Sequence, residues 1–110
     1  MRTYMAATRL SELAKTIRSK NAGVDKITFD IIFRDRVNYE RVKRARVLTR
    51  ETMAALYRIP AERISDFVEY DPGYAIKFTI YRLTPSGSAG DGDIFGAQQY
   101  APLLDLEVPA

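Results

Sequence analysis

The chain contains no cysteine and no histidine among its 110 residues. Without cysteine it can form no disulfide, offer no thiolate nucleophile and build none of the commonest zinc sites. Without histidine it cannot supply a Ser-His-Asp triad, a Cys-His dyad, a histidine-ligated metal or a histidine acid or base. Any acid–base chemistry within the chain would therefore depend on Asp, Glu, Lys or Tyr.

The sequence also lacks an apolar run of the length that a membrane span requires. Its first eight residues lack the continuous apolar region and the cleavage site of a secretory signal. Hydrophobic residues make up 46% and charged residues 28%, which is the composition of a soluble globular protein rather than a disordered one. We expect a single cytoplasmic domain spanning residues 1–110, small enough for its stability to benefit from a partner.

Basic residues are concentrated between residues 34 and 50, and no base follows Thr84. The bases of this stretch are Arg34, Arg36, Arg41, Lys43, Arg44, Arg46 and Arg50. A basic stripe can steer anions or nucleic acid, but on a small domain it is more often a solvated helix face or a docking surface for an acidic partner. Nucleic acid is therefore the less favoured partner.

Four segments have the pattern of strands. Residues 26–33 are dense in β-branched and aromatic side chains. Residues 63–70 and 74–82 flank the strong turn signal Asp71-Pro72-Gly73, and the second of them alternates apolar and polar side chains, which predicts an antiparallel hairpin. Residues 103–108 are the last strand candidate.

Helical spacing appears in two parts of the chain. Residues 36–46 are expected to form a helix, and Thr49 is the expected N-cap of a second helix that ends before Pro60. Residues 10–18 also have helical spacing, although an edge strand ending in a loop would fit them too. Helices grouped between antiparallel strands predict an α+β fold, and we expect a ferredoxin-like two-layer sandwich with two helices on one face of the sheet.

A glycine-rich loop is expected over residues 85–102, which follow neither a helix nor a strand period. If it closes over a ligand, its polar groups would come from Ser86, Ser88, Asp91, Asp93, Gln98 and Gln99. If it is an interface arm, its apolar anchors would be Ile94, Phe95 and Tyr100. Asp91-Gly92-Asp93 matches half of a calcium loop, but the remaining ligand spacing is missing, so no metal is predicted.

The polar segment 19–23 is expected to be a turn, in which successive amides and an ammonium could bind a carboxylate or a phosphate. Its candidate ligand-binding residues are Ser19, Lys20, Asn21 and Gly23. The alternative is a simple loop between two elements. If the glycine-rich loop approaches this turn, Lys20 would supply the positive charge that the loop lacks.

Four segments together carry a family resemblance over nearly the whole chain. They are Arg-Ser-Lys-Asn-Ala-Gly at 18–23, Thr-Phe-Asp-Ile-Ile-Phe at 28–33, Val-Leu-Thr-Arg-Glu at 47–51 and Gly-Asp-Gly-Asp-Ile-Phe-Gly-Ala-Gln-Gln-Tyr-Ala-Pro-Leu-Leu at 90–104. The chain resembles the short bacterial proteins of the domain-of-unknown-function 4387 family. That family is similar to the small ferredoxin-fold domain at the C-terminus of AtuA-type acyclic terpene utilisation proteins. The resemblance favours a strand for residues 10–17.

The resemblance implies a two-part system. The chain would be the small subunit, non-catalytic or contributing half a site, of a bacterial metabolic enzyme complex that acts on a small organic acid or acyl compound. Its partner would be an AtuA-type large subunit, and it would need no cofactor of its own. This hypothesis also predicts that the isolated chain self-associates or exposes apolar surface.

Two other functions are open. The chain could be an independent module for anions or nucleic acid that uses Arg41, Lys43, Arg44 and Arg46 on its helical face. A stand-alone enzyme that uses Asp91, Asp93 and Lys20 has no motif to support it.

Overall fold

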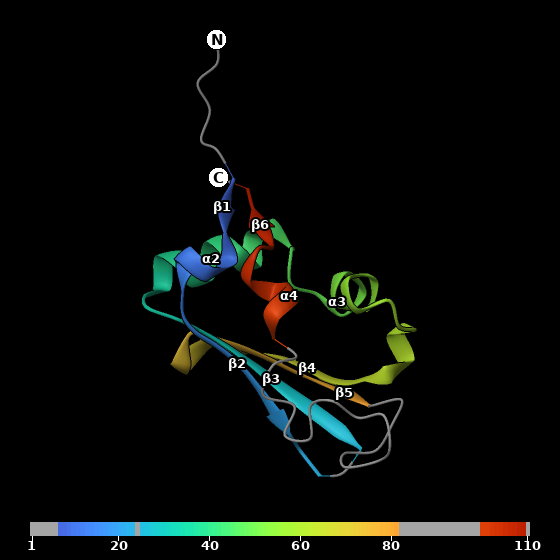
Figure 1. The fold of residues 1–110 in the computed structure, drawn as a ribbon. Helices are drawn as coiled ribbons and strands as arrows, with labels where there is room; N and C mark the ends of the chain where they lie inside the picture. The colour runs from blue at the N-terminus through green and yellow to red at the C-terminus, as the bar shows by residue number, and fades with distance from the viewer. Residues whose placement is uncertain (1–6, 24, 82–99, 110) are drawn as a thin grey trace.

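The structure, a computed structural model, describes residues 7–23, 25–81 and 100–109. Its main layer is a four-stranded antiparallel sheet in the order β2–β3–β5–β4, and helices α2 and α3 lie over one face of this sheet (Figure 1). The strands are β2 (Ala14–Asn21), β3 (Lys26–Phe33), β4 (Ile64–Tyr70) and β5 (Ala75–Tyr81), and the helices are α2 (Arg36–Ala45) and α3 (Arg50–Tyr57). The predicted α+β fold with an antiparallel sheet is confirmed.

Both of these helices lie in the single connection between β3 and β4. In a ferredoxin-like fold, each of two separate crossovers between strands carries one helix. Because both helices lie in one connection, the described order of elements does not confirm the finer, ferredoxin-like topology.

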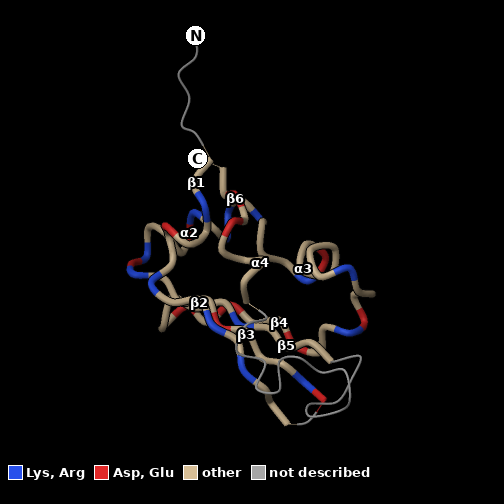
Figure 2. The backbone as a smooth tube through the Cα atoms, viewed as in Figure 1, with Lys and Arg blue, Asp and Glu red and all other residues tan. Residues whose placement is uncertain are grey.

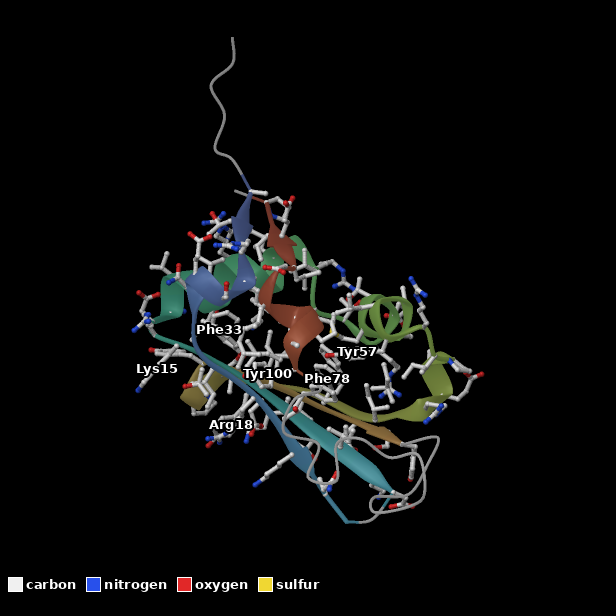
Figure 3. The ribbon with its side chains drawn as sticks, in the orientation of Figure 1. Lys15, Arg18, Phe33, Tyr57, Phe78 and Tyr100 are labelled. Atoms are coloured by element: carbon white, nitrogen blue, oxygen red, sulfur yellow. The ribbon has the colours of Figure 1, made fainter. Side chains whose placement is uncertain are left out.

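Successive side chains of the central strands point to opposite faces of the sheet, one covered by the helices and the other on the far side from them. Phe29 and Ile31 on β3 are buried, as is Phe78 on β5, directly opposite Phe29. The rings of Phe29 and Phe78 stack with centroids 4.5 Å apart, and Tyr57 of α3 lies 5.3 Å from Phe29. Figure 3 shows Tyr57 and Phe78 between the helices and the sheet. The core is therefore the space between these two layers.

Side chains cap the starts of both helices. Asp35 accepts a hydrogen bond from the backbone N–H of Asn38 at 2.9 Å at the start of α2. Thr49 and Thr52 form a reciprocal capping box at the start of α3, which confirms Thr49 as the N-cap. Within the described ranges, no helix is long and apolar enough to cross a membrane.

Residues 10–18 are neither all helix nor all strand. The chain forms a single helical turn, α1 (Leu10–Leu13), and then enters β2. A register shift between Ala14 and Thr16 inserts an extra residue opposite β3. Because of this bulge, Ala14 and Ile17 face the same side of the sheet although they are three residues apart. The three-residue spacing of apolar side chains, which suggested a longer helix, is thus produced by a bulge in the strand.

The C-terminal segment is also partly helical, so the strand predicted for residues 103–108 is wrong over its first half. The chain forms a turn of helix, α4 (Ala101–Leu104), and only β6 (Glu107–Val108) is extended. Pro102 favours the helical start because its fixed φ suits the first turn. Strand β6 pairs antiparallel with β1 (Thr8–Arg9), so the two ends of the described chain lie together (Figure 1).

Candidate functional site

The turn predicted at residues 19–23 is wrong over its first three residues, because Ser19, Lys20 and Asn21 belong to strand β2. Successive N–H groups of a strand point in opposite directions, so they cannot converge on one anion as turn amides do. The chain turns only after Asn21, and Gly23 adopts a φ of 92° there. This conformation suits glycine.

Tyr100 and Ser19 are brought into contact. The Tyr100 backbone N–H donates to Ser19 Oγ at 3.1 Å, and the Tyr100 side chain packs against the core at the start of α4 (Figure 3). Lys20 lies on the opposite face of the sheet from Ser19, since neighbouring residues of a strand alternate. The remaining predicted residues lie outside the described residues; these are Ser86, Ser88, Asp91, Asp93, Ile94, Phe95, Gln98 and Gln99.

The sheet face opposite the helices, here called the open face, carries a row of charges across three strands. The strand register places Arg18, Asp30 and Lys77 side by side. Arg18 Nε lies 3.1 Å from Asp30 Oδ2, and Lys77 Nζ lies 3.4 Å from Asp30 Oδ1. Only 6% of the Asp30 side chain is exposed, against 57% of Arg18 and 48% of Lys77. Two half-exposed cations therefore cover one buried carboxylate.

The open face also exposes large apolar side chains. Val68 stands directly opposite Lys77, and Tyr70 and Tyr81 lie on the same face; their exposed fractions are 49%, 51% and 39%. Lys26 Nζ lies 5.1 Å from the centre of the Tyr81 ring. Large apolar side chains that are exposed on one face and rimmed by polar groups mark a candidate surface for binding another macromolecule.

Part of the basic stripe on α2 (Lys and Arg in blue in Figure 2) is engaged within the fold. Arg41 donates to the carbonyls of Val108 and Pro109 and to Thr8 Oγ, and so ties the two chain ends to α2. Lys43 Nζ lies 3.1 Å from Asp71 Oδ1. Two of the four residues predicted for nucleic-acid binding are thus held by internal contacts, whereas Arg44 and Arg46 are exposed.

A polar cluster joins α2 to the Asp71–Gly73 turn beside a pocket of about 350 Å³. The Tyr39 hydroxyl donates to Asp71 Oδ1 at 2.6 Å, and Lys43 lies over the Tyr39 ring, 4.9 Å from its centre. Glu40 and Glu69 each lie 4.0 Å from the Lys43 ammonium. The sequence pattern did not reveal this cluster, because its members are up to 32 residues apart.

The pKa shifts within this cluster favour a structural role over acid–base catalysis. Burial, followed by the hydrogen bond to Asp71, raises the pKa of Tyr39. The hydrogen bond from Tyr39, followed by that from Lys43, lowers the pKa of Asp71, and the bond to Asp71 raises the pKa of Lys43. A general base or an amine nucleophile needs a pKa close to the working pH. Each shift here moves the group away from that range.

Alkaline titration is expected to ionise Tyr39 and Tyr57 only as the protein unfolds. Burial raises the pKa of both phenols, and unfolded tyrosine ionises near pH 10. Their contribution to stability is therefore complete below about pH 10 and is lost as the pH rises towards the folded-state pKa values. Tyrosinate absorbance and circular dichroism, followed together, should show late ionisation that coincides with loss of structure. A Tyr39→Phe variant should have one fewer tyrosine that ionises late in the titration.

This expectation fails if all seven tyrosines ionise near pH 10 while the circular dichroism is unchanged.

Comparison with known proteins gives one family. No curated protein and no solved structure matches the chain. The sequence profile described as "Domain of unknown function (DUF4387)" matches residues 10–107, from the α1 turn to the first residue of β6. The matched region contains the whole four-stranded sheet and both helices that cover it, and so the chain belongs to the DUF4387 family.

Proposed function

We propose that the chain is a small accessory subunit of a bacterial metabolic enzyme complex, and that its open face docks onto an AtuA-type large subunit. The observation that supports this proposal is the exposure of Val68, Tyr70 and Tyr81 on a sheet face that no described helix covers. We expect the complex to be cytoplasmic and to act on a small organic acid or acyl compound. This role does not require a ferredoxin-like topology.

The charges of the open face favour an acidic occupant over a second copy of the chain. The face carries four cations, Arg18, Lys20, Lys26 and Lys77, against the carboxylates of Asp30 and Asp66. Two copies placed face to face would bring an excess of like charges together, which costs binding energy. A large subunit that presents apolar side chains rimmed by carboxylates would satisfy both parts of this surface.

Among the described residues, the ionisable groups support docking more than catalysis. Asp30 is held by two cations, and Tyr39, Lys43 and Asp71 bind one another. No group of three or more Asp or Glu side chains in the described ranges is arranged to hold a metal ion. In this proposal, the reacting groups come mainly from the large subunit.

Co-expression of the tagged chain with the large subunit from the same host tests this role. We expect the two proteins to elute together in size-exclusion chromatography, and Val68→Asp/Tyr70→Asp to separate them. Val37→Asp is the matched control, because Val37 is 75% exposed on α2, in the layer opposite the open face. Separate elution of the wild-type proteins would contradict the proposal. A dimer of the chain alone that Val68→Asp/Tyr70→Asp dissociates would instead assign the open face to a second copy.

An independent nucleic-acid or anion module is the second candidate, since Arg44 and Arg46 are exposed on the helical side. Binding to phosphate groups would weaken steeply as salt concentration rises. If Arg44→Ala/Arg46→Ala left the affinity for a DNA duplex unchanged, this candidate would be eliminated.

A further inference from the structure

We propose that a pocket at the junction of α2 and α3 binds a small carboxylic acid through its carboxylate and a short apolar chain. The pocket has a volume of about 260 Å³ and is lined by Arg46, Leu48, Thr49, Arg50, Phe67 and Glu69. Pockets that hold drug-sized ligands start near 300 Å³, so this space suits a ligand of only a few heavy atoms. The proposal adds a ligand to the subunit role but can be tested on the chain alone.

Two guanidinium groups give the pocket its preference for an anion. Arg50 donates through Nη1 to the carbonyl of Ile64, which holds its side chain alongside β4. Arg46, the residue that ends α2, is exposed and also lines the pocket. Planar guanidinium groups match a carboxylate in shape and can bind it through two parallel hydrogen bonds.

Glu69 is the one acid among the six lining residues, and its charge is partly offset. Its Oε1 lies 4.0 Å from Lys43 Nζ. The six lining residues thus carry two cations, Arg46 and Arg50, against one carboxylate. Lys43 also has Asp71 at 3.1 Å and Glu40 at 4.0 Å, so we assign the ligand's carboxylate to the two arginines and not to the lysine.

The apolar lining sets the preference for a short carbon chain. Leu48 belongs to the core and is only 2% exposed, so Phe67 supplies most of the apolar surface that a ligand can reach. Phe67 is half-buried, with its ring stacked on Phe78 at a centroid distance of 5.8 Å. Burying two or three methylene groups against such a surface strengthens binding by about fourfold for each group. Inorganic phosphate would gain no such contact.

The backbone at Arg46 allows a variant that removes the guanidinium without disturbing the fold. Arg46 follows α2 with a φ of 57°, and Arg58 follows α3 with the same φ. Glycine adopts this left-handed conformation at no steric cost. Arg46→Gly and Arg58→Gly should therefore both fold at least as stably as the wild-type protein, and only the first alters the pocket.

Titration of the isolated chain with butyrate, followed by amide chemical shifts in NMR, tests the proposal. We expect signals around residues 46–50 and 67–69 to move, Arg46→Gly to weaken butyrate binding at least tenfold, and Arg58→Gly to leave it unchanged. Butanol, which has the chain without the charge, and phosphate, which has the charge without the chain, should each bind at least tenfold more weakly than butyrate.

Equal butyrate affinity in Arg46→Gly and the wild-type protein would overturn the proposal, as would shifts confined to other parts of the chain. Phosphate binding as tight as butyrate binding would refute the carboxylic-acid assignment. These outcomes do not depend on the large subunit, so they are distinct from failure of the docking role.

Discussion

Replacing Phe78 with alanine is expected to lower the free energy of unfolding by about 3–5 kcal/mol, the usual cost of removing a buried phenylalanine ring. Phe78 is 1% exposed on central strand β5. Its ring stacks on Phe29 at 4.5 Å and on Phe67 at 5.8 Å. The truncation leaves a cavity between two neighbouring strands and beneath α3. Urea unfolding followed by circular dichroism would measure the loss.

The control for this variant is Tyr81→Ala on the same strand. Tyr81 is 39% exposed and its ring contacts Lys26, so its replacement should lower the free energy of unfolding by only about 1 kcal/mol. Equal losses for Phe78→Ala and Tyr81→Ala would show that β5 does not place Phe78 in the core. That result would contradict the assignment of the two sheet faces.

Removing both cations beside Asp30 is expected to destabilise the protein more than removing Asp30 itself. In the variant Arg18→Met/Lys77→Met, the buried carboxyl of Asp30 remains but loses both ion pairs, and removing the partners of a buried charge costs about 3 kcal/mol. Methionine keeps the apolar stems of the two side chains. Asp30→Asn leaves two half-exposed cations that water can solvate, so its cost should be about 1 kcal/mol.

A triple variant separates the electrostatic effect from lost packing. Arg18→Met/Asp30→Asn/Lys77→Met leaves no charge in the row, and we expect it to recover most of the stability lost in the double variant. Chemical unfolding of the four proteins at pH 7 gives the comparison. A triple variant as unstable as the double variant would mean that packing, and not the buried charge, causes the loss.

Local composition was sufficient to predict the central elements of the fold. Residues 26–33 form β3 within the predicted bounds, and Thr49 caps α3 as its hydroxyl and position imply. The Asp71-Pro72-Gly73 signal marks the turn between β4 and β5. In each case, the preference of the residue type and its place in the tertiary fold agree.

The predicted secondary structure was wrong where a short irregularity in the backbone changes the spacing of the apolar residues. The bulge after Ala14 makes three-residue spacing consistent with a strand, so residues 10–18 gave a helical signal. Near the C-terminus, residues 103–108 have a strand-like pattern, yet Leu103 is completely buried in a turn of helix. Periodicity over six residues does not distinguish these two structures.

The charge row on the open face could not be located from the sequence. Asp30 is visible as one acid in an apolar strand, but its partners lie 12 and 47 positions away. Pairing them requires the register of β2 and β5 against β3, which depends on the bulge and on the connection through both helices. The sequence did suggest a basic stripe, yet it could not show that Arg41 and Lys43 bind within the fold.

Hydroxyl-radical footprinting with and without the proposed large subunit tests the proposed docking role most directly, because it reports side-chain exposure. Tyr70 and Tyr81 represent the open face, and Val37 on α2 represents the helical layer. We predict that adding the large subunit slows oxidation of both tyrosines at least several-fold and leaves Val37 unchanged. Protection of Val37 with no change at Tyr70 and Tyr81 would contradict docking through the open face.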